Sequence, residues 1–307
     1  MIEEPFGSGM ALILVGTFFA HKLYKQNILT LGDYYRDRYG RSVELLCSVA
    51  IVISYLGWVG AQVTALGLVI NLITEGAVSM TTGMVIGAAV VLAYTMVGGM
   101  WSVAMTDFVQ MIVIVVGLVA ILWFATDLAG GMDKVVDYAR GRDLFHAFPE
   151  PTTTGWLFWI SAAMTMMIGS IPQQDVFQRV MSAKNLPTAV AGPILGGSFY
   201  ILFAFVPMFI VVAAILVMPD AAEKMLSEDP QQLLPTLVRD YMPMWLRVVF
   251  FGAVLSAVMS TASATMLAPS TIFVENVLRH FMKIDDRNML RACLLYTSPS
   301  PRDQRGS

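Results

Sequence analysis

Long apolar runs, repeated along the chain, constrain this fold more than any other feature of the sequence. A transmembrane helix needs about 20 consecutive apolar residues, because the hydrocarbon core of a bilayer is about 30 Å thick. Several runs exceed this length, so we expect tilt or extension beyond the membrane. The chain is therefore predicted to be an all-α polytopic membrane protein with about seven transmembrane helices. The apolar runs cover residues 6–25, 43–74, 82–99, 103–125, 155–172, 188–218 and 245–278.

Composition supports a lipid environment and argues against several classes of function. Hydrophobic residues make up 57% of the 307 residues and charged residues only 13%, whereas about 25% of a typical soluble domain is charged. The formal charge of −3 provides no basic field, so nucleic-acid binding is not expected. Cys47 and Cys293 are too few for a metal cluster, and a structural disulfide is not expected. No nucleophile–base pair, metal motif or phosphate loop indicates an enzyme, and Gly98-Gly99 lacks the following Lys-Ser or Lys-Thr of a phosphate loop.

The charges between the apolar runs alternate, which predicts the orientation of the helices. Lys and Arg follow the first, fifth and seventh runs, and because cytoplasmic loops are enriched in these residues, these loops are predicted to lie inside. The basic residues are Lys22, Lys25, Arg36, Arg38, Arg41, Arg179, Lys184, Arg279, Lys283, Arg287 and Arg291. The loops predicted to lie outside carry Glu75, Asp127, Asp133, Asp137, Asp143, Glu150, Asp220, Glu223, Glu228, Asp229 and Asp240.

Shorter patterns predict how the helices pack and connect. Gly83 and Gly87, like Gly192 and Gly196, are four residues apart, and such pairs of small residues let membrane helices approach closely. We therefore expect both pairs to serve packing. The long outer loops at 126–154 and 219–244 are predicted to form short helices along the membrane interface.

A set of motifs carries a family resemblance. The stretch Tyr94–Ser102, which holds a Gly98-Gly99 turn and is followed by Thr106-Asp107 and Gln110, is the most specific of them. Other stretches agree in order: 29–34 with 38–40, 177–179 with 182–184, and 257–261. Together they resemble the sodium/solute symporter family. The resemblance implies the inverted-repeat fold of the bacterial leucine transporter, with two five-helix repeats, of which the first would lack its first helix and the second would stop after its third.

Both ends of the chain look cut. The first apolar run begins about six residues after Met1, which predicts that upstream helices are missing. From Cys293 onward the sequence resembles a translated sequencing adapter, so residues 293–307 are expected to be a disordered, non-native tail. The domain prediction is therefore a partial transporter membrane domain over residues 1–292.

The function that the resemblance implies is sodium-coupled secondary transport (symport) of a small organic solute by alternating access. Na⁺ is then the coupling ion, no organic cofactor is expected, and the partners are the solute and the lipid bilayer. The resemblance also places the protein in a bacterial inner membrane, and the oligomeric state is not predicted. Two alternatives stay open: the membrane sensor domain of a histidine-kinase fusion, and a fragment that does not transport because its first core helix is absent.

The last apolar run offers oxygen atoms for a cation. Sodium requires about five hard oxygen ligands, which a membrane interior supplies from hydroxyls, carboxylates and unwound carbonyls. Ser260 and Thr261 are adjacent, with the Ala257 carbonyl one turn below, and the resemblance implies a sodium site at these three residues. The alternative is that the hydroxyls only bond carbonyls four residues back or join helices. The nearby hydroxyl residues are Ser256, Ser263 and Thr265.

Asp107 is an acid within an apolar run. A carboxylate at membrane depth is costly, so its presence favours a functional role. It could instead lie in the first turn of the fourth helix, where an acid complements the helix dipole. The resemblance implies a role in coupling or in sodium release.

A predicted helix break marks the candidate solute site. In transporters of this kind the solute binds where a helix is interrupted near the membrane midplane, and Pro172 removes a backbone donor within the fifth run. A kink without a ligand is the alternative, as is plain packing for the aromatic residues. Segments here resemble the choline-transporting branch, but Gln173 replaces that branch's tryptophan, so amino acids, carboxylates, pantothenate and sugars remain open. The candidate residues are Tyr55, Trp58, Gln62, Met166, Gly169, Ser170 and Gln173.

Overall fold

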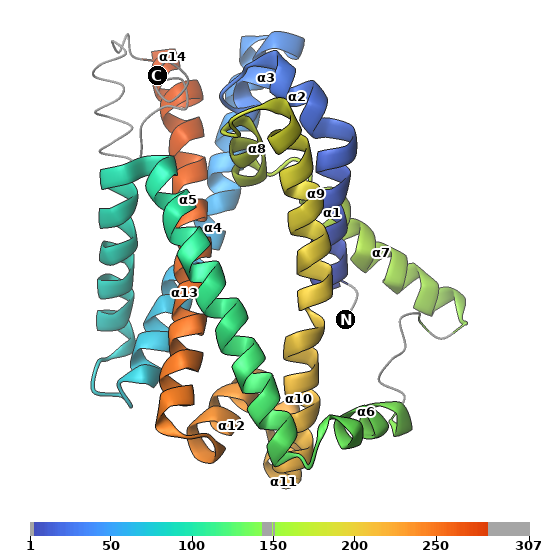
Figure 1. The fold of residues 1–307 in the computed structure, drawn as a ribbon. Helices are drawn as coiled ribbons and strands as arrows, with labels where there is room; N and C mark the ends of the chain where they lie inside the picture. Colours follow the sequence, from blue (N-terminus) through green and yellow to red (C-terminus); the bar gives the residue numbers. More distant parts are fainter. Residues whose placement is uncertain (1–2, 143–148, 150, 282–307) are drawn as a thin grey trace.

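The computed structural model describes residues 3–142, 149 and 151–281, and its ordered elements are all helices (Figure 1). The predicted tail from Cys293 lies outside the described residues. The elements are η1 (Glu3–Gly7), α1 (Ser8–Leu14), η2 (Val15–Phe19), α2 (Ala20–Gln26), α3 (Leu31–Tyr39), α4 (Arg41–Ile73), α5 (Met80–Leu128), α6 (Met132–Gly141), α7 (Thr153–Gly169), α8 (Gln174–Met181), α9 (Leu186–Phe203), α10 (Phe205–Val217), α11 (Pro219–Glu228), η3 (Pro230–Gln232), α12 (Leu233–Tyr241), α13 (Met244–Ile272), η4 (Phe273–Leu278) and α14 (Arg279–Phe281).

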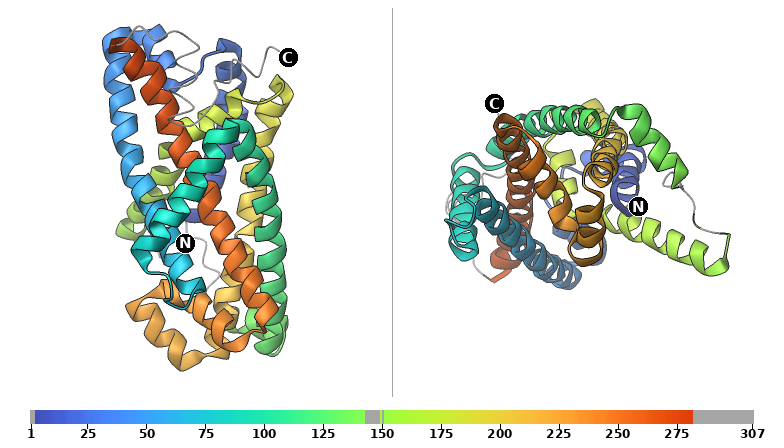
Figure 2. Two further views of the ribbon diagram at one scale, coloured as in Figure 1. Left: turned by 90° about the vertical axis from the view of Figure 1, so that its left-hand side faces the viewer. Right: turned by 90° about the horizontal axis from the view of Figure 1, so that it is seen from below.

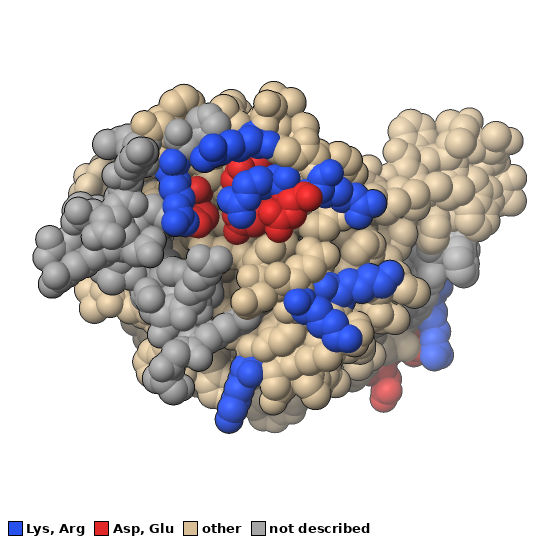
Figure 3. All heavy atoms as spheres, turned by 90° about the horizontal axis from the view of Figure 1, so that it is seen from above, with Lys and Arg blue, Asp and Glu red and all other residues tan. Residues whose placement is uncertain are grey.

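The long helices run lengthwise through an elongated bundle, from which α7 projects sideways (Figures 1 and 2). The short helices α3, α8 and α14 lie at the upper end in Figure 1, and α6, α11 and α12 lie at the lower end. The described residues of the basic loops therefore gather at one end, as the alternating charges predict, whereas Lys283, Arg287 and Arg291 lie outside the described residues. Figure 3 shows Lys and Arg around a group of Asp and Glu on this upper end.

Five helices are long and apolar enough to cross a membrane, or up to six if the bent pair α7–α8 counts as one span. All seven predicted apolar runs are helical, and the counts differ because α5 is a 49-residue element that contains two runs. Its two arms meet at Gly99, whose φ of 52° and ψ of −142° interrupt the helix. A positive φ favours glycine, which explains the turn in the Gly98-Gly99 motif.

The predicted run 155–172 is wrong at its end. Helix α7 stops at Gly169, and α8 begins at Gln174 after a bend of 45°. Pro172 has no N–H to continue the helix, so the segment breaks instead of kinking. The predicted run 188–218 is likewise divided at Ala204 into α9 and α10.

Large apolar side chains cover the outside of the bundle. Val97, Trp123 and Phe158 are 89%, 71% and 74% exposed. Such exposure would be unfavourable in water, because apolar surface is driven out of it. In lipid the same residues contact acyl chains, so the exposed fractions agree with a multi-pass membrane protein.

The glycine pairs have different environments. A Cβ on Gly83 would lie 2.9 Å from the Gly67 carbonyl oxygen, and one on Gly87 would lie 2.8 Å from the Leu66 Cβ. These contacts confirm close packing between α4 and α5. In contrast, a Cβ on Gly192 or Gly196 would meet no atom within 4 Å, so the packing prediction for this pair is wrong.

A buried polar cluster joins the helices of the upper end. The Asn276 side chain accepts a hydrogen bond from Thr30 at 2.6 Å and donates to Asp33 at 3.1 Å and to Glu44 at 2.8 Å. Arg36 pairs with both carboxylates, at 3.1 Å and 3.3 Å. Partial burial opposes the charged form of Arg36, but the charges of Asp33 and Glu44 outweigh it and raise the Arg36 pKa. We call these five residues the α3 cluster.

Candidate functional site

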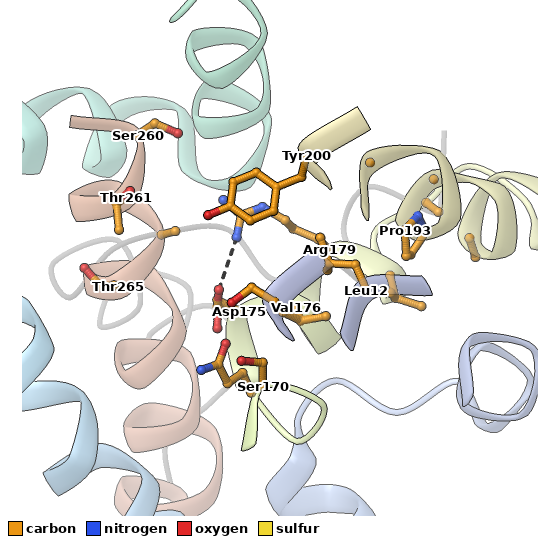
Figure 4. Close-up of a pocket in the computed structure, with 18 of the residues that line it drawn as sticks. Leu12, Ser170, Asp175, Val176, Arg179, Pro193, Tyr200, Ser260, Thr261 and Thr265 are labelled. Carbon is orange, nitrogen blue, oxygen red and sulfur yellow. Dashed lines mark ion pairs between the residues drawn. The ribbon is translucent and has the colours of Figure 1, made fainter. Parts of the chain in front are cut away.

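A cavity of about 830 Å³ lies between α1, α4, the α7–α8 break, α9 and α13 (Figure 4). Its wall on α9 includes Gly192 and Gly196, which explains the open space beside these glycines. Ser8 and Leu12 contribute from α1, and Tyr200 projects from α9 toward Arg179. A cavity of this size between membrane helices is large enough for a small organic solute.

The break between α7 and α8 exposes polar groups to this cavity. Met166, Ser170 and Gln173 line it at the break, and Trp58 lines it from α4. These four residues belong to the predicted solute site. The described lining residues do not include Tyr55, Gln62 or Gly169, so these three predicted residues are not brought to the cavity wall.

Hydroxyl groups of α13 form the facing wall. Ser260, Thr261 and Thr265 line the cavity. Thr261 donates to the Ala257 carbonyl at 3.1 Å, the bond to the preceding turn that the alternative reading predicts. Because a hydroxyl that donates its proton keeps its oxygen lone pairs, this bond is compatible with a cation ligand. Of the three residues predicted for the sodium site, Ser260 and Thr261 line the cavity, whereas Ala257 is joined to it only through the Thr261 bond to its carbonyl.

Asp107 belongs to the second arm of α5 and lies about two turns beyond Gly99. The alternative that it lies in the first turn of its helix, where an acid complements the helix dipole, is therefore wrong. Its carboxylate accepts a hydrogen bond from Ser260 at 2.6 Å and pairs with Arg179 at 3.1 Å. The acid thus connects the hydroxyl wall to α8.

A chain of polar contacts continues from α8 to α4. Arg179 lies 3.6 Å from the Asp175 carboxylate, in the ion pair drawn in Figure 4. The other oxygen of Asp175 accepts a hydrogen bond from the Tyr55 hydroxyl at 2.5 Å, and the Asp175 N–H donates to the same hydroxyl at 3.2 Å. Tyr55 therefore reaches the site through Asp175. We call Tyr55, Asp107, Asp175, Arg179 and Ser260 the cavity cluster.

Sequence reasoning did not identify Asp175 or Arg179 as site residues. Both line the cavity, and they are four residues apart on α8. An acid and an arginine at this spacing are typical of a solvated helix face. Two signals were available: both residues follow a proline-containing break in an apolar run, and Arg179 ends the motif at 177–179.

The polar groups of the site can bind a cation and the polar parts of a small solute. It offers hydroxyl and carbonyl oxygens, two carboxylates and a guanidinium. In the described part of the chain, no group of three or more His, Cys, Asp or Glu gathers to hold a metal ion. That finding concerns side chains suited to transition metals or calcium, whereas the α13 wall consists of hydroxyls and carbonyls.

Known proteins resemble this chain over most of its length. The chain is 30% identical to the human high affinity choline transporter 1, over 90% of this chain and 48% of the relative. The zebrafish sodium/glucose cotransporter 4 is 26% identical, over 89% and 46%. A solved structure of a Na⁺-coupled sialic acid symporter, in a substrate-bound outward-open state, superposes with a TM-score of 0.80 at 17% identity and covers 94% of this chain and 62% of that one.

The structural likeness establishes the fold. The chain spans about half the length of the curated relatives it matches. These relatives are transporters, and none of those named here is an enzyme. The model of the sodium:solute symporter family matches residues 5–295. On this evidence the chain belongs to the sodium:solute symporter family.

Proposed function

We propose that this chain forms part of a secondary transporter that couples the passage of a small organic solute to sodium. The observation that carries the proposal is the meeting of two features at one cavity. A broken helix presents polar groups on one side, and the hydroxyl wall of α13 lies on the other. Membership of the sodium:solute symporter family supports the same activity.

The proposed sodium site consists of the Ala257 carbonyl and the Ser260 and Thr261 hydroxyls. Three oxygens are fewer than the five or so that sodium requires, so water, solute or further protein groups complete the shell. The Asp107 carboxylate accepts a hydrogen bond from the Ser260 hydroxyl at 2.6 Å. Its negative charge makes this wall favourable for a cation, since charge interactions are strong where water is scarce.

Asp107 is the proposed coupling residue because it contacts two different elements. It bonds Ser260 of α13 and pairs with Arg179 of α8. A cation beside Ser260 attracts the Asp107 carboxylate and weakens its pairing with Arg179. Sodium then favours one arrangement of α8 over another, which is the differential binding that a population shift requires.

The proposed solute site lies at the α7–α8 break, with Trp58, Met166, Ser170 and Gln173 as the contacting residues. Tyr55, Gln62 and Gly169 stay in the proposal as neighbours of these residues on α4 and α7. The relatives transport choline or glucose by name, so both belong in any set of test solutes, with amino acids and carboxylates. A bacterial inner membrane remains part of the proposal.

Uptake measurements test the proposal. The protein, expressed from its complete natural reading frame, is given labelled choline, glucose, proline, pantothenate and sialic acid, with and without an inward sodium gradient. We expect accumulation of at least one solute only with the gradient. A well-expressed protein that accumulates none of a widened panel would contradict the proposal and favour the sensor alternative.

A further inference from the structure

The cavity cluster contains one more negative than positive charge. Asp107 and Asp175 each carry a carboxylate, and Arg179 pairs with both. Within the described residues, Asp175 and Arg179 are the charged residues among those that line the cavity. The side chains of Asp107 and Asp175 are 22% and 12% exposed, and a surplus charge on largely buried carboxylates is unfavourable without a counter-ion.

We propose that a single sodium ion supplies the missing positive charge, and that Asp175 receives Arg179 when the ion binds beside Asp107. The proposal rests on the proposed function and deepens it, because it names the residues that carry coupling from the sodium site to α8. With the ion bound, two carboxylates face one guanidinium and one sodium, and the cluster is neutral.

The geometry allows Arg179 to change partners within one helix. Its Nη2 lies 3.1 Å from Asp107 Oδ2, and its Nη1 lies 3.6 Å from Asp175 Oδ2. Asp175 and Arg179 are both on α8 and move together, whereas Asp107 is on α5. A shift of Arg179 toward Asp175 therefore removes a charged contact between α8 and α5. This contact is the one that sodium weakens.

Asp175 is held in place to receive the guanidinium. Tyr55 donates to Asp175 Oδ1 at 2.5 Å and accepts from the Asp175 N–H at 3.2 Å, which leaves Oδ2 directed at Arg179. The side chain is only 12% exposed. Because buried charges are screened less than exposed ones, this carboxylate retains a strong attraction for Arg179.

Equilibrium binding of radioactive sodium to the purified protein tests the proposal without any knowledge of the solute. In Asp175→Asn the cluster is already neutral before sodium binds. We expect its sodium affinity to fall by about tenfold or more, since a neighbouring charge shifts a site by on the order of one to three decades. Asp175→Glu keeps the charge and should stay within about threefold of the unaltered protein.

Removal of the positive charge of Arg179 should change the sodium affinity in the opposite direction. Arg179→Gln leaves two carboxylates without a cation, so sodium should bind about tenfold more tightly. At the same time, the α5–α8 contact is lost whether sodium is present or not. Sodium-dependent uptake should therefore fall although sodium binding improves. A residue that only stabilised the fold would not separate these two quantities.

Asp33→Asn is the matched control, because Asp33 is also a buried carboxylate paired with an arginine, in the α3 cluster. Its sodium affinity should not change. Unaltered sodium affinity in Asp175→Asn would overturn the inference, as would weaker binding in Arg179→Gln or an equal loss in Asp33→Asn. If the unaltered protein binds no sodium, the proposed function itself fails, which is a different result.

Discussion

The α3 cluster and the cavity cluster contain the same charged groups, two carboxylates and one arginine, but differ in their surroundings. In the α3 cluster, Asn276 donates to both acids and is itself 2% exposed. In the cavity cluster, Arg179 pairs with both acids, and both Arg179 and Asp175 line the cavity. The first arrangement is closed by protein groups, whereas the second has room for a ligand. Composition alone therefore does not distinguish a structural cluster from a binding site.

The largest effect that we expect is a loss of sodium-driven uptake when the cavity cluster, but not the α3 cluster, is altered. Asp107→Asn removes the negative charge that pairs with Arg179, and it replaces one of the two oxygens that Ser260 and Arg179 contact with an amide nitrogen. We expect sodium-driven uptake to fall at least about a hundredfold, because one variant removes both a charge near the ion and the contact to α8. Uptake is measured at equal surface expression, with Asp33→Asn alongside. Near-normal uptake in Asp107→Asn would remove the functional distinction between the two clusters.

A variant in the α3 cluster should lower stability and leave sodium binding unchanged. Asn276→Leu leaves two buried carboxylates without their amide donor. We expect a loss of about 2–4 kcal/mol in the free energy of unfolding. Thermal unfolding in detergent provides the measurement, as a lowered midpoint. Sodium affinity of the protein that remains folded should be unchanged, and a large change in affinity would assign the α3 cluster to the binding machinery.

A pair of glycine variants extends the contrast between packed and open regions. Gly83→Ala places a Cβ 2.9 Å from a backbone oxygen, so the unfolding midpoint should fall as α4 and α5 are pushed apart. Gly192→Ala adds its methyl group to open space in the cavity and should leave the midpoint nearly unchanged. Its effect should be on the KM for the solute. Equal destabilisation by both variants would contradict the placement of the cavity.

The smallest expected effect concerns an exposed ion pair. Arg239 and Asp240 lie 2.7 Å apart, with side chains 58% and 45% exposed. Their hydrogen bond lowers the Asp240 pKa, but exposed pairs contribute at most about 1 kcal/mol. Arg239→Gln should change the unfolding midpoint by an amount close to the error of measurement. A clear loss would indicate that exposure is a poor guide to the strength of these pairs.

Much of the fold was predictable because it depends on local patterns. The apolar runs give the helices, the alternating loop charges give the two ends, and Gly98-Gly99 gives the turn within α5. The break at Pro172 was also visible, although its position was predicted three residues too late, at the proline instead of at Gly169. A proline disfavours helical backbone in the residue before it, so the helix ends upstream.

The site was predictable only in part, because its members come from distant segments. Ser260, Thr261, Trp58, Met166, Ser170 and Gln173 were expected, and all line the cavity. The role of Asp175 depends on Tyr55, which is 120 residues away in sequence. The contrast between Gly83 and Gly192 likewise depends on which helix lies opposite. No spacing rule within one helix provides that information.

Sodium-dependent uptake by the double variant Ser260→Ala, Thr261→Ala tests the central claim most directly. Ser270→Ala is the control, because its hydroxyl is on the same helix, donates to Met266 and does not line the cavity. We predict that the double variant reaches the surface but loses sodium-dependent uptake, whereas Ser270→Ala retains it. Normal sodium dependence in the double variant would contradict the claim that the α13 hydroxyls hold the coupling ion.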